Sequence, residues 1–308
     1  MKYLPFLTGM YSVAPGLIPL SKAENDYDKL IFQVDNSYEN YLNNKTNCRK
    51  ENISKYYLQH HFPDETNRRI INYIASQLQQ EYPAWFEFSN DSTVCRFLNY
   101  KTNELVTWNS DTLTLYGDKY VSVFDALCSQ VQEDIAVCQL KDTKDWIAAI
   151  HICSPNHWSP SEKSGKTFDV VHAPVAGMQK TFPHYFKMLQ SIISKGPFTR
   201  FAWGIATDNR LNHHPVPPLG IDNEDWRGRQ LTKDTPLFIR TEKQNMVGFP
   251  EVNAFLFTIR TYFYEVALLQ NEEKKQLWAA VQSMSPESLA YKGLTGITDV
   301  LLKRLFDE

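Results

Sequence analysis

The stretch FIRTEKQNMVGFPEVNAFLFTIRTYF, residues 238–263, consists of two long runs in which successive side chains alternate in character. In the second run, every second residue from Phe255 to Phe263 is aromatic or β-branched. A period of two is typical of β-strands, because successive side chains of a strand point to opposite faces of the sheet. The stretch therefore predicts two strands, within Pro236–Val247 and Glu251–Tyr264.

The segments that precede this stretch predict the rest of a sheet. A hairpin is expected where the turn KDTKD (141–145) separates the apolar runs 131–140 and 146–153. Residues 178–195 predict a helix, and Phe198–Thr207 predicts a third long strand. Two strands, a helical insert and three more strands predict an α+β fold, with one antiparallel five-stranded sheet and helices on one face. This is the element order of a PAS-type fold, in which the insert and the sheet enclose a ligand.

Other elements flank this core. A helix is predicted over residues 64–81, and short β segments within residues 92–116. Residues 1–60 are interpreted as an irregular segment that wraps the core. The tail predicts three helices, Glu272–Met284, Pro286–Tyr291 and Ile297–Phe306. We accordingly expect three parts: an N-terminal extension (1–128), a PAS-like core (129–265) and a C-terminal helical segment packed on the core (266–308).

Composition excludes several classes of protein. The 308 residues are 43% hydrophobic and carry a formal net charge of −3, with both signs well mixed. Such a chain has no basic field for a nucleic acid or an anionic membrane. The apolar N-terminus is interrupted by Pro5, Gly9 and Pro15, so it predicts neither a membrane helix nor a secretory signal. The five cysteines include no C-x-x-C pair, which favours reduced thiols. We expect a soluble, cytoplasmic protein.

The sequence lacks the common motifs of cofactor and hydrolase sites. No G-x-G-x-x-G, P-loop, H-E-x-x-H or G-x-S-x-G pattern occurs. The chain thus shows no site for a nicotinamide, a flavin or an iron–sulfur cluster. Any redox chemistry would need electrons from another protein.

One histidine, His172, is a candidate metal ligand because of the residues that surround it in the sequence. In NHWSPSEKSGKTFDVVHAPVAG, residues 156–177, His172 follows an apolar run and precedes an Ala-Pro-Val turn. Pro174 restricts the backbone before it, so the imidazole is expected to be held rigidly. An imidazole with apolar walls suits a metal-centred cofactor. The alternative is a core histidine with both nitrogens hydrogen-bonded.

The last three predicted strands carry charged residues, which are rare in the interior of a sheet. Alternation places Arg240, Glu242 and Gln244 on one face, which either lines a cavity or is solvated. Arg260 has apolar flanks and is expected to form a buried ion pair or to contact a ligand. Arg200 opens the preceding strand.

Two further histidine positions lie outside these strands. His157 could bring a second imidazole close to His172. The pair His213-His214 resembles a metal clip, but adjacent residues rarely both reach one ion, so a solvated loop is favoured.

Six segments, in this order, resemble the haem-dependent oxidative N-demethylase α-subunit family. They are VQEDIAV (131–137), NHWSPSEKSGKTFDVVHAPV (156–175), RFAWGI (200–205), IRTEKQ (239–244), FLFTIRTY (255–262) and YKGL (291–294). The N-terminal stretch through GLIPL (16–20) is also similar, so the resemblance covers nearly the whole chain. It implies a PAS-type domain that binds haem b and acts as a dimethylamine monooxygenase-like oxidoreductase.

The resemblance also implies partners and an activity. The expected reaction is the O2-dependent demethylation of a small secondary amine, with electrons from a flavin and iron–sulfur reductase subunit. Neither a nucleic acid nor a membrane is expected as a partner. A haem-binding sensor or carrier without catalysis is the alternative, and a structural protein that has lost haem is a third. A carboxylate at Glu242 favours the enzyme, because a sensor of a neutral gas does not need one.

The resemblance assigns roles to individual residues. It implies that His172 is the iron ligand and that Arg200 and Glu242 are the catalytic residues of the distal side. Arginine there would stabilise negative charge on bound dioxygen, and the carboxylate would orient and deprotonate the amine. Further contacts to the cofactor, including the haem propionates, are expected from Trp158, Lys163, Gln244, Arg260 and Tyr262.

Three positions depart from the family's pattern. The family has arginine where this chain has His157 and Lys243, and proline where it has Ala176. Lysine at position 243 is expected to alter a propionate contact or an exterior ion pair. An imidazole at position 157 could compete with His172 as an axial ligand.

Overall fold

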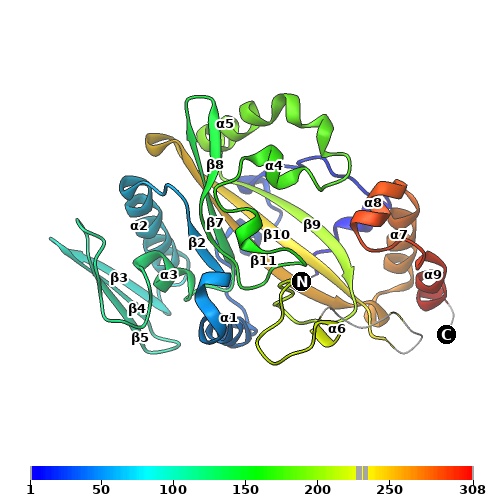
Figure 1. Cartoon of the computed structure of the whole chain (residues 1–308), viewed down its shortest axis with the longest axis horizontal. Helices are drawn as coiled ribbons and strands as arrows, with labels where there is room; N and C mark the ends of the chain where they lie inside the picture. Colours follow the sequence, from blue (N-terminus) through cyan, green and yellow to red (C-terminus); the bar gives the residue numbers. More distant parts are fainter. Residues whose placement is uncertain (1, 227–230, 232–234, 307–308) are drawn as a thin grey trace.

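The centre of the molecule is an antiparallel sheet whose strands differ in length (Figure 1). The computed structural model describes residues 2–226, 231 and 235–306. Within these residues the sheet has seven strands in the order β1-β9-β10-β11-β7-β8-β2. Their bounds are β1 (Ile18–Pro19), β2 (Tyr57–Gln59), β7 (Asp134–Lys141), β8 (Lys144–His151), β9 (Phe198–Ala206), β10 (Phe238–Phe249) and β11 (Ala254–Glu265).

The α+β class and the antiparallel sheet are confirmed, but five strands were expected and seven are found. The two additional strands, β1 and β2, come from the N-terminal segment and pair with β9 and β8. Each covers the edge of a long strand, where unpaired backbone groups would otherwise remain.

A second, four-stranded sheet lies at one end of the molecule (Figure 1, left). It consists of β3 (Phe86–Asp91), β4 (Val94–Asn99), β5 (Glu104–Asn109) and β6 (Leu115–Tyr116). The predicted helix, α2 (Asp64–Glu81), and the short α3 (Val123–Cys128) cover one face of this sheet. Phe86, Phe97 and Trp108 are fully buried between them.

The expectation of an irregular N-terminal segment is wrong in one part. A fifteen-residue helix, α1, spans Tyr38–Asn52, followed by η4 (Ile53–Lys55). Its sequence is strongly polar, and its buried face carries Tyr38, Tyr41, Lys45 and Cys48 at helical spacing. Lys45 is buried because its ammonium donates to the carbonyl oxygens of two other segments. Periodicity of apolar residues could not reveal such a face. Elsewhere the segment is irregular, with η1 (Pro5–Thr8), η2 (Leu20–Lys22) and η3 (Tyr27–Lys29).

The helical insert covers one face of the large sheet, as predicted. It comprises η5 (Pro160–Glu162), α4 (Phe168–His172), η6 (Met178–Lys180), η7 (Phe182–His184) and α5 (Tyr185–Lys195). The helix expected over 178–195 begins only at Tyr185, because two 3-10 turns precede it. Leu189 and Ile192 of α5 pack on Met246 and Phe255 of the sheet.

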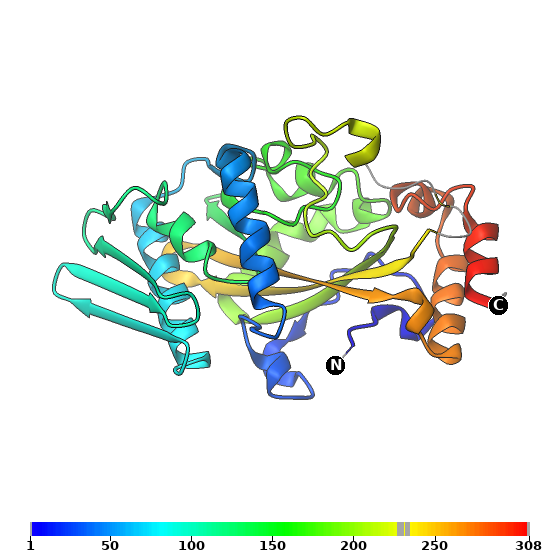
Figure 2. The same cartoon turned by 90° about the horizontal axis from the view of Figure 1, so that it is seen from below.

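The C-terminal helices lie at the end opposite the small sheet (Figure 2). They are α7 (Asn271–Gln282), α8 (Pro286–Tyr291) and α9 (Thr298–Phe306), close to the three predicted ranges. Two 3-10 turns, η8 (Pro250–Val252) and η9 (Val266–Leu268), flank β11, and α6 (Asn223–Trp226) lies between β9 and β10 in the sequence. Residues 227–230 and 232–234 lie outside the described residues. None of the helices described here is both long and apolar enough to cross a bilayer.

Candidate functional site

A cavity of about 310 Å³ lies between the large sheet and the helical insert. This volume is within the range of small-molecule and cofactor sites. Its sheet wall includes the apolar residues Ala136, Ile147, Ile150, Met246, Phe257 and Ile259. Tyr11 of the N-terminal segment and Tyr291 of α8 line it from outside the sheet and the insert. Four separate parts of the chain therefore build one enclosure.

His172 lies at the end of α4 and lines this cavity. Its Nδ1 is 2.8 Å from the carbonyl oxygen of Phe168, and its ring stacks on that phenyl ring with centroids 4.0 Å apart. A carbonyl can only accept, so Nδ1 carries the proton and Nε2 keeps its lone pair. Burial lowers the pKa of His172 to about 4, so the imidazole is neutral at pH 7.

The two nitrogens of His172 are therefore not equivalent. Within the described ranges, Nε2 has no protein hydrogen-bond partner, which favours His172 as a ligand over a core histidine with both nitrogens bonded. A histidine whose Nδ1–H is held by a backbone carbonyl is oriented as metal-ligating histidines commonly are.

Glu242 is a carboxylate in the same cavity. Gln244 donates from Nε2 to its Oε2 at 2.9 Å, and Nε of Arg240 lies 3.5 Å from its Oε1. All three residues line the cavity, so the face that alternation predicted is turned inward and is not solvated. Two neighbours on the same strand thus hold the carboxylate group.

Arg200 reaches the cavity from β9, directly across from Gln244 in the sheet register. Its Nε is buried and has no hydrogen-bond partner among residues 2–226, 231 and 235–306. Burial lowers the pKa of this guanidinium, and the charge of Glu242 opposes that effect. A buried donor without a partner costs free energy, so the site is arranged for an acceptor.

Cations outnumber carboxylates around the cavity. Lys163, Arg200, Arg240 and Lys292 line it, and Glu242 is its only acidic residue within the described chain. Burial lowers the pKa values of both lysines. Buried charges need partners, so an excess of positive charge favours an anionic ligand.

The model of one protein family, described as haem-dependent oxidative N-demethylase, alpha subunit-like, matches residues 23–302. The chain belongs to this family. The family's description associates it with haem and with oxidative N-demethylation, and an alpha subunit implies a partner subunit.

The residues of the cavity fit haem. His172 offers one neutral nitrogen toward an enclosure with apolar walls, as a haem iron requires from a single protein ligand. The excess of buried cations matches a macrocycle that carries two carboxylates. Lys163 lies with Nζ 4.6 Å from the ring centroid of Trp158, and both residues line the cavity.

The structure places two of the expected cofactor contacts elsewhere. Arg260 and Tyr262 lie on the opposite face of the sheet and do not line the cavity. The buried guanidinium of Arg260 forms an ion pair with the partly exposed Asp35 at 2.9 Å, and it is 3.8 Å from the ring centroid of Tyr41. The hydroxyl of Tyr262 donates to Gln33. Of the two possibilities for Arg260, the ion pair is the one found, with only the arginine fully buried.

Other expectations about charged residues are corrected in the same way. Lys243 also lies on the opposite face, where it donates to the carbonyl oxygens of Asp28 and Leu30, so it contacts no group in the cavity. His157 does not line the cavity and packs its ring on His213 with centroids 5.0 Å apart. The pair His213-His214 is buried rather than solvated, because hydrogen bonds from both rings tie it to the protein.

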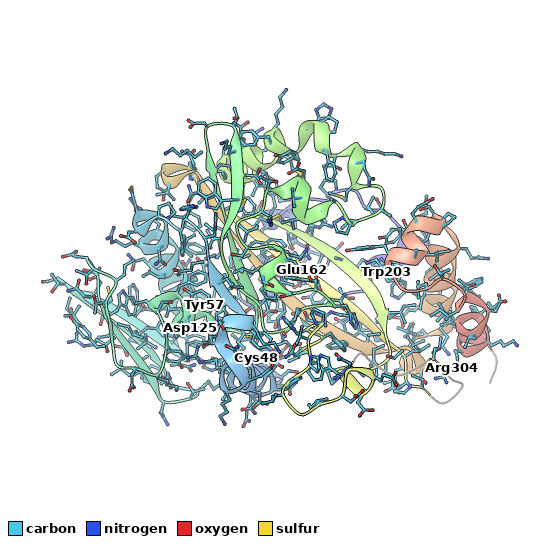
Figure 3. The ribbon with its side chains drawn as sticks, in the orientation of Figure 1. Cys48, Tyr57, Asp125, Glu162, Trp203 and Arg304 are labelled. Atoms are coloured by element: carbon cyan, nitrogen blue, oxygen red, sulfur yellow. The ribbon has the colours of Figure 1, made fainter. Side chains whose placement is uncertain are left out.

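Sequence reasoning missed four residues that complete the site. Tyr11, Trp203, Tyr291 and Lys292 line one part of the cavity, and Lys292 donates to the carbonyl oxygen of Trp203 at 2.7 Å. Figure 3 shows Trp203 on β9, beside the C-terminal helices. The segments RFAWGI and YKGL were recognisable, but nothing in them indicated that both meet at the cavity.

Proposed function

We propose that this chain is the haem-binding subunit of an oxidative N-demethylase that acts on a small secondary amine with O2. Electrons would come from a separate flavin and iron–sulfur reductase subunit, because the sequence contains no motif for either cofactor. The observation that carries the proposal is the shared cavity of His172 and Glu242, which combines a neutral imidazole with a held carboxylate.

Haem b, when bound, would supply the activation of dioxygen. His172 would hold the iron through Nε2, since Nδ1 is bonded to Phe168. The low pKa of His172 keeps Nε2 unprotonated at neutral pH, so the ligand needs no deprotonation before it binds. Lys163 and Lys292 are candidates to pair with the two propionates.

Glu242 would bind the amine. A small secondary amine is a cation at neutral pH, and a carboxylate inside an apolar cavity both attracts it and can accept its proton. Gln244 and Arg240 fix the carboxylate, so the amine would be bound in one orientation. Arg200, whose Nε lacks a partner among the described residues, would donate to negative charge that develops in the cavity.

The strand order supports a PAS-type core within residues 129–265. The five long strands lie in the order β8-β7-β11-β10-β9, with the helical insert over the face that carries the cavity. Numbered along the chain, that order is 2-1-5-4-3, so the first strand lies beside the last at the centre of the sheet. A ligand between sheet and insert is the arrangement that this order predicts.

The absorbance spectrum of the purified protein with added haem tests the proposal. We expect a Soret band in the wild type and its loss in His172→Ala, because the only proposed protein ligand is removed. His184→Ala is the matched control, since His184 is exposed in η7 and should leave the band unchanged. A wild-type Soret spectrum that persists in His172→Ala would refute His172 as the ligand.

Amine titrations distinguish the enzyme from the sensor. Dimethylammonium should perturb the Soret band of the wild type and should do so at least tenfold more weakly in Glu242→Gln, which keeps the shape of the side chain without its charge. An equal response of both proteins would remove Glu242 from the amine site. Turnover without an added electron donor would contradict the requirement for a reductase.

A further inference from the structure

Arg240 connects the cavity to a buried loop that lies outside it. The side chain is almost completely buried, and its Nε lies 3.5 Å from Oε1 of Glu242. At the other end of the guanidinium, Nη2 donates to the carbonyl oxygen of Ser154 at 2.6 Å. Nη1 lies 3.4 Å from Nδ1 of His213 and 3.4 Å from the carbonyl oxygen of Leu211. The Arg240 guanidinium is therefore in contact with His213 and its loop as well as with the cavity.

The chemistry of these contacts determines the tautomer of His213. A guanidinium can only donate, so Nδ1 of His213 must accept, and Nε2 must carry the proton. Nε2 lies 2.7 Å from Oδ1 of Asp208, which is the acceptor that this tautomer needs. Burial lowers the pKa of His213 and so favours the neutral ring. Although burial alone raises the pKa of Asp208, hydrogen bonds from His213 and Arg210 lower it and keep the carboxylate ionised.

The backbone holds His213 in place on both sides. Its N–H donates to the carbonyl oxygen of Pro155 at 3.1 Å, and its carbonyl oxygen accepts from the N–H of His157 at 3.0 Å. Asn156, between these two residues, lines the cavity. The backbone of His213 is thus fixed by the segment that leads into the cavity wall, and its ring is held by Asp208.

We propose that His213, whose tautomer Asp208 sets, is a positioning residue that holds Arg240 against Glu242 and thereby fixes the carboxylate that receives the substrate amine. The inference rests on the proposed function in one respect, the binding of an amine by Glu242. His213 does not line the cavity, so it acts through Arg240.

Two substitutions of His213 separate its two hydrogen bonds. In His213→Asn the amide oxygen can occupy the place of Nδ1 and accept from Arg240, while the bond to Asp208 is lost. In His213→Gln the amide nitrogen can occupy the place of Nε2 and donate to Asp208, while Nη1 of Arg240 loses its acceptor at position 213 and keeps only the carbonyl oxygen of Leu211. We expect the apparent Kd for dimethylammonium, measured by the Soret shift, to stay near the wild-type value in His213→Asn. In His213→Gln it should rise about tenfold, as for the loss of one charge-assisted hydrogen bond.

A double substitution tests whether His213 acts through Glu242. Glu242→Gln removes the charge that Arg240 faces, so adding His213→Gln to it should weaken amine binding no further. His214→Gln is the matched control, because His214 is an equally buried neighbour whose ring bonds to Ser159 and Val216 and not to Arg240. Equal weakening by His213→Asn and His213→Gln, or additive losses in the double variant, would overturn the proposal.

Nitrogen NMR of the haem-free wild type keeps this test independent of the proposed function. With ¹⁵N-labelled histidine, His213 should show a protonated Nε2 and an unprotonated Nδ1 at pH 7. The opposite tautomer, or an imidazolium, would refute the contact to Arg240 whether or not haem binds. A wild type that binds haem but does not respond to dimethylammonium would instead refute the role of Glu242, and the contact would then be judged by NMR.

Discussion

The two faces of β10 each carry a buried cation, and the two cations have different partners. Arg240 faces the cavity and meets Glu242, whereas Lys243 faces the N-terminal segment and donates to the carbonyl oxygens of Asp28 and Leu30 at 3.0 and 3.2 Å. Lysine carries three donors on one nitrogen, which suits two nearby carbonyl oxygens. Burial lowers the pKa of Lys243 to about 8.

The pKa of Lys243 predicts how stability depends on pH. The unfolded chain keeps this proton up to about pH 10.5 and the folded protein only up to about pH 8, so unfolding takes up a proton between these values. The contribution of Lys243 to stability therefore rises with pH. Relative to Lys243→Met, the free energy of unfolding of the wild type should increase by about 1 kcal/mol between pH 8 and pH 9. Urea unfolding at both values measures this difference, and an unchanged difference would show that the folded pKa is not lowered.

At the scale of elements, α5 lies unusually close to β10. A Cβ atom on Gly248 would lie 2.1 Å from the carbonyl oxygen of Ile193, so the strand can approach the helix only because it has glycine there. This close contact lets α5 pack Leu189 and Ile192 on the sheet and form one wall of the cavity.

Gly248→Ala should therefore lower the free energy of unfolding by about 3 kcal/mol, because the backbone of α5 must move away from the sheet. Gly204→Ala is the matched control: Gly204 lies on the adjacent strand, and no heavy atom lies within 4 Å of its added Cβ. Thermal unfolding followed by circular dichroism measures both variants. Equal stability of the two would contradict the close approach of helix and strand.

The whole molecule brings distant segments to one cavity. Tyr11 comes from the N-terminal segment and Lys292 from the end of α8, and the ammonium of Lys292 lies 5.8 Å from the ring centroid of Tyr11. Both are held by the core in which Phe6 and Trp203 pack against the C-terminal helices. The closure of the cavity therefore depends on both ends of the chain.

Lys292→Met should weaken haem binding about tenfold, because the substitution removes one of the buried cations that favour an anionic ligand and keeps most of the apolar stem. Lys303→Met, at an exposed position of α9, is the control and should have no effect. Titration of the haem-free protein with haem, followed at the Soret band, gives both affinities. A wild-type affinity in Lys292→Met would exclude this lysine from the cofactor site.

Sequence patterns by themselves determined the α+β class, the helix over residues 64–81, the long strands, and the shared face of Arg240, Glu242 and Gln244. They did so because amphipathic periodicity is a local property of the chain. Only the tertiary structure decided which face of the sheet meets the helical insert. Period-two alternation shows which residues share a face but not where that face points, so it left Arg260 open between an ion pair and a ligand contact. The cofactor contact that the resemblance implied is not found, because Arg260 lies on the other side. The same holds for α1 and Lys292, whose partners are supplied by remote segments.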